Sequence, residues 1–288
     1  MELEKFRARK SDKINLSKIE SDYTGGIDSK EEAQELLEKN IKKTAELQEK
    51  LYAQVRYSLL IIFQAVEAAG KDSAIKHVMS GLNPQGTQVF SFKQPSTEEL
   101  NHDYMWRTSK SLPERGRIGI FNRSYYEEVL IVRVHNLLKS QKIPAEFITK
   151  DIWEERFDQI RNFEKYLCEN GTYILKFYLN VSKKEQAKRF LERIDDPAKN
   201  WKFSSSDLTE RDYWDEYMKC YQEAISATST KFAPWYIIPA DKKWFTRLAI
   251  SEVIIETLKS MDLKYPQLND EQKKNLVVCK DKLLKAES

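Results

Sequence analysis

The chain has 288 residues, of which 41% are hydrophobic and 32% charged, and its formal net charge is only +3. This composition is typical of a globular protein with one large domain or two small ones, and the charge is too small to predict bulk nucleic-acid binding. No apolar run approaches the ~18 residues of a membrane span, and the polar N-terminus lacks the apolar core of a signal peptide. Three widely spaced cysteines without a C-x-x-C pair favour free thiols and a cytoplasmic location. We therefore expect neither a nucleic acid nor a membrane as partner.

Helical and strand patterns alternate along the chain. Residues 1–28 are polar and irregular, and Asp28 or Ser29 would cap a helix that continues to about residue 55. The apolar run at 57–63 has the composition of a strand that is buried on both faces. Further strands are predicted at 88–92, 118–121, 172–181 and 235–240, and helices at 73–80, 96–112, 125–138, 152–168, 183–194, 210–228 and 242–262.

Five strands that alternate with helices predict an α/β fold, in which helices cover both faces of a parallel sheet. We expect residues 1–55 to form an N-terminal arm and a helix that packs on the core. Residues 56–262 would form the main domain, and residues 263–288 a helical tail.

The stretch FQAVEAAGKDSA, residues 63–74, resembles a phosphate-binding loop with two changes. In the usual pattern, G-x-x-x-x-G-K-[ST], backbone amides and the lysine bind phosphates. Gly70 and Lys71 are present, but Ala65 replaces the first glycine and Asp72 replaces the Mg²⁺-binding hydroxyl residue. Because the stretch lies between a buried strand and a helix, we interpret it as a functional phosphate loop.

The changed positions add negative charge to this loop. Asp72 and Glu67 would repel a phosphate unless a divalent metal lies between them. The alternative for Asp72 is that it only favours the helix dipole in the first turn.

A second candidate stretch, GRIGIFNRSYYEEVL, also places polar residues directly after a predicted strand, here 118–121. Ordinary phosphate-loop enzymes place an Mg²⁺-binding acid at the end of such a strand, and here Asn122 and Arg123 stand there. Open α/β folds bind ligands at this edge of the sheet, and Glu127 would face the same crevice. The alternative is that Asn122 and Ser124 only cap the next helix.

A third candidate is the basic helix 183–194 with the break that follows it. Arg193, Lys199 and Lys202 flank a proline-containing loop, which suits a mobile lid over phosphates at about residues 183–212. The alternative is an ordinary solvated surface.

Taken together, these stretches resemble the family-2 polyphosphate kinases. The resemblance runs from about residue 30 to residue 260, in one order, through EAAGKDSAIKHVMSGLNPQG, SFKQPS, HDYMWR, LPERGRIGIFNRSYYEEVL, KFYLNVSKKEQAKRFLERI, KNWKFS and TSTKFAPWYIIPADKKWFTR. One position departs from the pattern, because family members carry Asp where this chain has Glu67. Glutamate can also bind Mg²⁺, but its extra methylene moves the carboxylate further from the backbone.

This resemblance implies a P-loop kinase-like fold, a three-layer α/β/α sandwich with a central parallel five-stranded sheet and a helical lid. It implies Mg²⁺, with Mn²⁺ as an alternative, and phosphoryl transfer between inorganic polyphosphate and AMP, ADP or ATP. Asn122 resembles the subgroup that accepts AMP as well as ADP. A homo-oligomer, a dimer or a tetramer, is also expected.

The resemblance and the patterns together assign roles to individual residues. Catalytic roles are expected for Glu67, Lys71, Asp72, Asn122 and Arg123. Nucleotide binding is expected of Asp103, Arg107, Asn122, Arg123 and Glu127. Polyphosphate binding is expected of Ala68, Ala69, Gly70, Lys71, Arg117, Arg133, Arg193, Lys199 and Lys202. The metal would be held by Glu67, Asp72 and Glu127.

Two other functions are compatible with the same fold. One is a nucleoside monophosphate kinase that uses ATP as donor, against which the missing loop glycine and hydroxyl residue count. The other is a polyphosphate-binding protein without catalysis, against which the retained Lys71 and Arg123 count.

Overall fold

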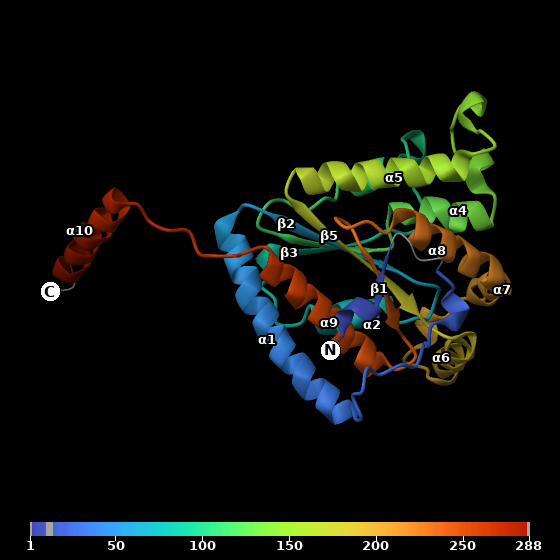
Figure 1. The fold of residues 1–288 in the computed structure, drawn as a ribbon, viewed down its shortest axis with the longest axis horizontal. Helices are drawn as coiled ribbons and strands as arrows, with labels where there is room; N and C mark the ends of the chain where they lie inside the picture. Colours follow the sequence, from blue (N-terminus) through green and yellow to red (C-terminus); the bar gives the residue numbers. More distant parts are fainter. Residues whose placement is uncertain (1, 10–13, 287–288) are drawn as a thin grey trace.

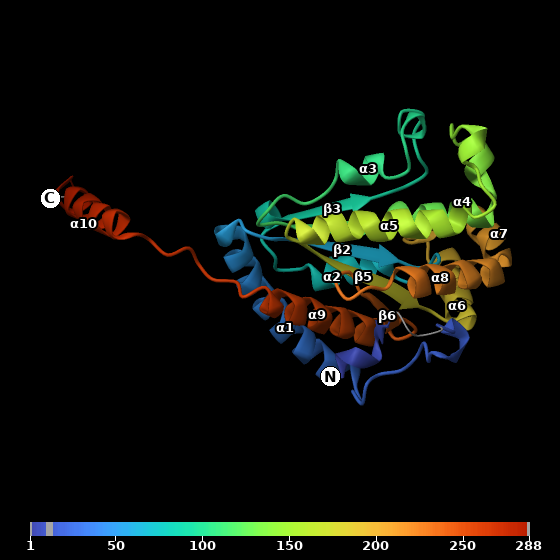
Figure 2. The ribbon, with the colours of Figure 1, turned by 45° about the horizontal axis from the view of Figure 1, so that its top comes forward.

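A six-stranded sheet with helices on both faces forms the centre of the computed structural model, which describes residues 2–9 and 14–286 (Figures 1 and 2). Its strand order is β1-β6-β5-β2-β4-β3. Five strands run parallel, namely β2 (Ser58–Gln64), β3 (Thr87–Ser91), β4 (Ile118–Asn122), β5 (Thr172–Asn180) and β6 (Trp235–Pro239). The predicted α/β/α architecture and its five parallel strands are confirmed.

The sixth strand, β1 (Arg7–Ala8), corrects the prediction of a purely parallel five-stranded sheet. It pairs antiparallel with β6, with Arg7 opposite Tyr236 and Ala8 opposite Trp235. Phe6 and Ala8 are buried, so this part of the N-terminal arm packs on the core instead of being irregular. A strand of two residues is too short to show any periodicity, which is why the sequence did not reveal it.

Helices cover each face of the sheet over a separate hydrophobic core. On one face lie α1 (Lys30–Gln54), α2 (Lys71–Val78) and α9 (Lys243–Ser260), and on the other lie α4 (Ile131–Val134), α5 (Ile152–Glu169) and α8 (Trp214–Thr228). Side chains of β2 alternate between the two cores, with Phe63 on the side of α9 and Ile62 on the side of α5. The strand is therefore apolar throughout, as its sequence predicted.

The remaining elements lie around this sandwich. The helices α6 (Lys183–Asp195) and α7 (Ser206–Asp212) lie near the carboxyl ends of the strands, and α3 (Trp106–Ser109) lies beside β3 (Figure 2). The 3₁₀ turns are η1 (Leu3–Lys5), η2 (Leu16–Lys18), η3 (Pro84–Gly86), η4 (Glu99–Asn101), η5 (Tyr125–Val129), η6 (Leu137–Ser140), η7 (Ala145–Phe147) and η8 (Asn200–Lys202).

Three predicted helices are shorter or broken. The segment 96–112 holds only η4 and α3, the segment 125–138 is divided into η5, α4 and η6, and the segment 210–228 divides at Tyr213 into α7 and α8. In the second case a buried polar cluster fixes the chain: Lys176 Nζ lies 2.6 Å from Glu164 Oε2 and 2.9 Å from the Tyr126 hydroxyl. Tyr125 also donates to Glu164, at 3.0 Å. These tertiary contacts override the helical pattern of the sequence.

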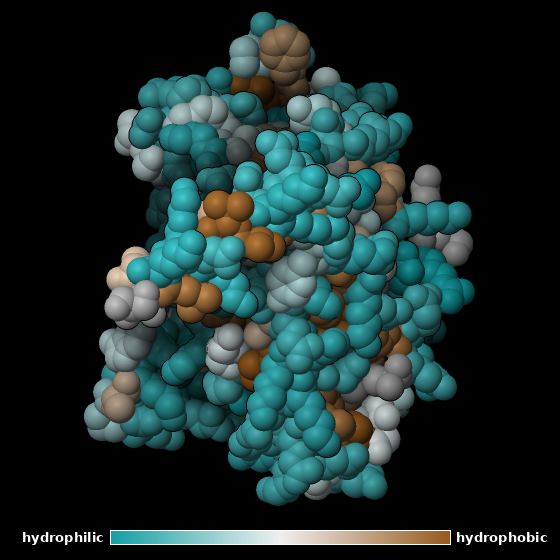
Figure 3. All heavy atoms as spheres, turned by 90° about the vertical axis from the view of Figure 1, so that its left-hand side faces the viewer, coloured by the Kyte–Doolittle hydropathy of each residue, from teal (hydrophilic) through white to brown (hydrophobic). Residues whose placement is uncertain are grey.

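The last helix, α10 (Asp270–Ala286), extends away from the sandwich (Figure 1). None of its residues is buried, and it exposes Leu276, Val277, Val278, Leu283 and Leu284. Seen from that side, the surface is mainly hydrophilic with small apolar patches (Figure 3).

Within the described ranges, none of the helices has both the length and the apolarity needed to cross a bilayer. Cys168, Cys220 and Cys279 are free thiols, as expected.

Candidate active site

The phosphate loop lies between the carboxyl end of β2 and the first turn of α2. Ala68 and Gly70 adopt left-handed backbone conformations, with φ of 58° and 106°. The value at Gly70 suits glycine, and this residue is the N-cap of α2. The loop thus directs the first backbone amides of α2 toward the carboxyl edge of the sheet, where they can bind an anion.

Lys71 is the buried centre of this site. Its side chain is folded back on the loop, where Nζ donates to the Ala65 carbonyl oxygen at 2.8 Å, and only 8% of the residue is exposed. Burial lowers the pKa of Lys71, and the nearby Glu67 opposes that effect. Arg123, Glu127 and Asp72 also act on the pKa of this lysine, so charged residues that follow β2 and β4 surround it.

Glu67 and Arg123 form an ion pair across the mouth of the loop. The ammonium of Lys71 is the main cause that lowers the pKa of Glu67, and Arg123 adds to it, so the carboxylate is ionised despite its partial burial. The backbone of Arg123 is left-handed, with φ of 65°, which costs a non-glycine residue about 1–2 kcal/mol. The Arg123 amide donates to the Phe63 carbonyl oxygen at 3.0 Å. The left-handed backbone at Arg123 directs its side chain toward the loop.

Asn122 is the last residue of β4 and contacts the loop directly. Its Nδ2 donates to Asp72 Oδ1 at 2.5 Å and lies 3.5 Å from the Ser91 hydroxyl. The neutral amide therefore satisfies one oxygen of Asp72, where a second carboxylate would repel it. This contact joins the end of β4 to the first turn of α2.

A cleft of about 210 Å³ opens above the Glu67–Arg123 pair. Glu127 lines it as predicted, while the opposite wall comes from α7 and α8 and includes Asp207, Glu210 and Tyr217. Sequence reasoning missed these wall residues, because a polar loop between helices gives no sign of which side chains point inward.

Arg189 and Gln186 of α6 are two more residues that sequence reasoning missed. Arg189 is only 3% exposed, and its guanidinium donates to the carbonyl oxygens of Ala68 (3.1 Å), Ala69 (2.7 Å), Ala240 (2.6 Å) and Asp241 (3.0 Å). It therefore joins the phosphate loop to the segment that follows β6. Gln186, one turn earlier in α6, adds a bond from Nε2 to the Glu67 carbonyl oxygen at 2.9 Å. In the sequence both residues look like part of a solvated helix.

The predicted lid residues lie in different surroundings. Arg193 lowers the pKa of Glu67 and donates to the Lys202 carbonyl oxygen at 3.2 Å, so it faces the site. Lys199 is exposed and pairs with Asp196 at 2.7 Å. The ammonium of Lys202 lies 4.9 Å from the centre of the exposed Trp201 ring.

Two predicted polyphosphate ligands do not join this site. Arg117 precedes the first residue of β4, whereas Asn122 ends that strand, so the two lie at opposite edges of the sheet. Arg117 donates there to the Gln85 carbonyl oxygen, at 3.1 Å. Arg133 pairs with Glu223 between α4 and α8. Arg117 is close to the motif in sequence but not in space, because the length of β4 separates it from Asn122.

Two residues of the HDYMWR segment, Arg107 and Asp103, were predicted to bind the nucleotide, and they also lie in different surroundings. Arg107 donates to the Lys93 carbonyl oxygen at 2.7 Å. Burial lowers the pKa of Arg107, and the negative charge of Glu127 opposes that effect. Asp103 is exposed and accepts from the Met105 amide at 2.8 Å. Arg107 therefore lies against Glu99 and the Lys93 carbonyl oxygen outside the lining of the cleft, and Asp103 closes a local turn.

Comparison with known proteins agrees with this geometry. The chain is 52% identical over 282 residues to a protein of Rhodopseudomonas palustris named ADP-polyphosphate phosphotransferase, with 97% of this chain and 98% of the relative covered. It is 41% identical to an AMP/ADP-polyphosphate phosphotransferase of Meiothermus ruber, with 92% and 96% covered.

A solved structure is similar as well. The crystal structure of polyphosphate kinase 2 from Arthrobacter aurescens matches with a TM-score of 0.86 and 39% identity, over 96% of this chain and 95% of that one. The model of the family described as polyphosphate kinase 2 (PPK2) matches residues 27–266. Family model, relatives and structure cover nearly the whole chain, and the chain belongs to the polyphosphate kinase 2 family.

Proposed function

We propose that this protein transfers phosphoryl groups from inorganic polyphosphate to ADP and AMP, giving ATP and ADP, in a reversible reaction. The observation that supports this most is the buried Lys71, which interacts with Glu67, Asp72, Arg123 and Glu127 at the end of a phosphate loop. The names of the two relatives, one for ADP and one for AMP and ADP, agree with both acceptors.

Individual residues have separate roles in phosphoryl transfer. An oxygen of the acceptor phosphate attacks the terminal phosphorus of the chain, and the bond from that phosphorus to its bridging oxygen breaks, leaving polyphosphate one unit shorter. Such a transition state needs alignment and neutralisation of charge. Lys71 and the loop amides bind the transferred group, and Arg123 binds the acceptor phosphate. Glu67 holds Arg123 in place through their ion pair.

The carboxylates fit a divalent metal that is shared with the substrate. In the described ranges no three His, Cys, Asp or Glu side chains form a ready-made metal cluster. Mg²⁺ is commonly bound by one or two carboxylates together with phosphates, so a partial protein site suits it. Asp72 and Glu67 would hold Mg²⁺, or Mn²⁺, with Glu127 assisting. The ion would neutralise charge between neighbouring phosphates.

Asn122 supports the use of AMP. AMP brings its only phosphate to the donor chain, and the amide adds no negative charge beside Asp72. An aspartate at this position would add one, at a distance where the repulsion amounts to several kcal/mol before screening.

We also propose that the protein acts in the cytoplasm, where its nucleotide substrates are found, as a homo-oligomer. The apolar side chains that α10 exposes support association into a dimer or tetramer. Light scattering of the purified chain measures this directly.

One assay tests the function. Purified protein is incubated with ADP or AMP, polyphosphate and Mg²⁺ without added ATP, and nucleotides are separated by chromatography. Formation of ATP from ADP, and of ADP from AMP, is expected. Transfer that needs ATP and ignores polyphosphate would instead indicate a nucleoside monophosphate kinase. Binding of polyphosphate without any turnover would indicate a protein without catalysis.

A further inference from the structure

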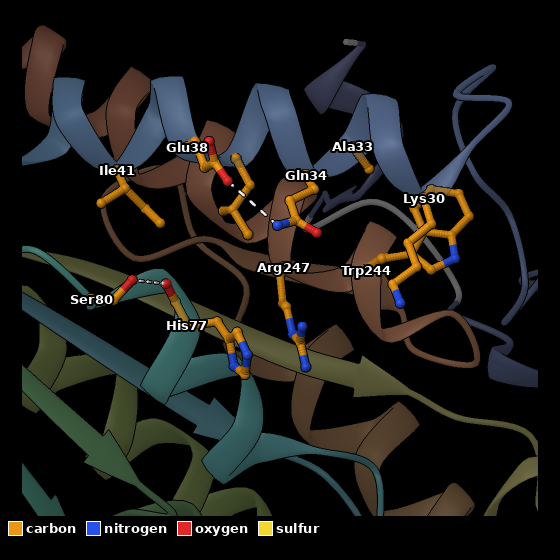
Figure 4. A pocket seen from close by; sticks show the side chains of 10 residues that line it. Lys30, Ala33, Gln34, Glu38, Ile41, His77, Ser80, Trp244 and Arg247 are labelled. Atoms are coloured by element: carbon orange, nitrogen blue, oxygen red, sulfur yellow. Dashed lines mark hydrogen bonds between the residues drawn. The ribbon is translucent and has the colours of Figure 1, made fainter.

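A second cavity, of about 380 Å³, lies between α1, α2 and α9, outside the cleft described above (Figure 4). Its apolar floor includes Ala33, Leu37 and Ile41 of α1. Arg247 and His77 extend into it from α9 and α2, and Lys30 points toward it beside Trp244 (Figure 4). The single carboxylate of the lining, Glu38, accepts a hydrogen bond from Gln34 at 3.4 Å. Positive charge therefore predominates at the rim.

Arg247 connects this cavity to the phosphate loop. Its Nη2 donates to the Ser73 hydroxyl at 2.9 Å, and Ser73 is the third residue of α2, two positions after Lys71. Its Nε is buried and has no hydrogen-bond partner among the described residues. Buried donors are nearly always satisfied in proteins, so an unpartnered one beside a cavity indicates a missing acceptor.

Two further basic residues lie near Arg247, namely Lys243, one turn earlier in α9, and His77 on α2. Burial lowers the pKa of Lys243, and the positive charges of Arg189 and Arg247 lower it further. On α2 itself, His77 is one turn beyond Ser73, and its Nδ1 lies 2.8 Å from the Ser73 carbonyl oxygen.

We propose that this cavity binds the distal part of the polyphosphate chain, whose reacting end lies in the phosphate loop. The proposal rests on the proposed function and adds to it a second binding segment, formed by Arg247 and Lys30 with His77 beside them. From Lys71 to His77 the helix rises by about 9 Å, so a donor whose reacting end lies at the loop must extend by several phosphates to fill the cavity. Polyphosphate supplies closely spaced anionic oxygens, which would satisfy the buried Arg247 Nε and offset the repulsion among the cations.

The decisive variant is Lys30→Gln, because Lys30 is exposed and lies on α1, away from the phosphate loop. Arg247→Gln is its companion, and Lys76→Gln is the matched control, since Lys76 is an exposed residue of α2 outside the cavity lining. Each substitution removes one positive charge. Steady-state rates are measured with long-chain polyphosphate and with tripolyphosphate at saturating ADP. Direct titration of each polyphosphate into each protein accompanies them.

We expect KM and Kd for the long chain to rise roughly threefold to fivefold for Lys30→Gln, as for loss of one partly screened charge contact. The values for tripolyphosphate should stay at those of the Lys76→Gln control. Equal changes for both chain lengths, or none for either, would overturn the proposal. Weaker binding of ADP or ATP, with polyphosphate binding unaffected, would also overturn it and identify a nucleotide site. If wild-type protein lacked polyphosphate turnover, the proposed function would fail, and the titrations would still decide whether the cavity binds the chain.

Discussion

Replacement of Arg189 by methionine tests how the phosphate loop is held in place. The guanidinium donates to four carbonyl oxygens, two in the loop and two in the segment after β6, and its Nε pairs with Glu185 Oε1 at 2.9 Å. Methionine keeps much of the apolar volume of the side chain but none of these bonds. The carbonyl groups of the loop would then lose a buried, charged donor that water replaces only in part.

The size of the effect follows from those contacts. A hydrogen bond to a charged group contributes about 1.5–3 kcal/mol, and bonds that share one guanidinium are not additive. Loss of one partner from a buried charged contact typically costs about 3–5 kcal/mol. We therefore expect the free energy of unfolding to fall by about 3–5 kcal/mol for Arg189→Met. We expect kcat to fall roughly 100-fold, as for a displacement of reacting groups by about 1 Å.

Urea unfolding and steady-state kinetics with ADP and polyphosphate measure the two effects. Arg189→Lys keeps the charge and can satisfy some of the carbonyl groups, so it should recover part of both losses. Lys188→Gln is the matched control, because the neighbouring Lys188 is exposed and pairs only loosely with Glu185 and Glu192, at 3.9 and 4.0 Å. It should resemble the wild type.

If Arg189 positions the phosphate loop, its loss should change kcat separately from stability. The loss in kcat should persist at temperatures and urea concentrations where Arg189→Met is fully folded, and amide hydrogen exchange should accelerate in residues 65–70. Wild-type kcat in a destabilised but folded variant would show that Arg189 only stabilises the fold. Wild-type stability together with wild-type kcat would refute the reasoning altogether.

Three further outcomes are expected. Lys71→Met should lower kcat by roughly 10²–10³, because it removes a donor at the developing charge; unchanged turnover with intact circular dichroism would remove Lys71 from the mechanism. Asn122→Asp should lower the AMP-to-ADP rate ratio roughly tenfold, because it adds a charge beside Asp72; an unchanged ratio means that acceptor choice is set elsewhere. Because burial lowers the pKa of Lys71 from 10.5, kcat/KM should decline as pH rises, with a midpoint below 10.5. A profile that is flat to pH 10.5 in folded protein would contradict this.

Much of the site could be predicted because its residues follow the ends of apolar strands. Lys71 comes after β2 and Arg123 after β4, and parallel neighbours bring their carboxyl ends to one edge. Arg189 and Gln186 could not be found in this way. Their helix is rich in charge, and only the packed structure shows that one side of it lies against the loop.

The fold was predictable to a similar degree and for related reasons. Buried parallel strands have continuous apolar sequences, so β2 and β5 were recognised with nearly their true bounds. The segment from Tyr125 to Leu138 was not, because its tyrosines are held by Glu164 in the core. Local helical spacing cannot report a partner that lies on a distant helix.

The short strand β1 also has a consequence for solubility. It occupies the outer edge of β6, where Ile237 donates to the Phe6 carbonyl oxygen at 2.7 Å. Without it, β6 would present an open row of backbone donors and acceptors beside the apolar side chains of Trp235 and Tyr236. Exposed edges of this kind template pairing with other chains. The N-terminal arm thereby protects the sheet from edge-to-edge aggregation, so tags and truncations at this end of the chain should spare residues 6–8.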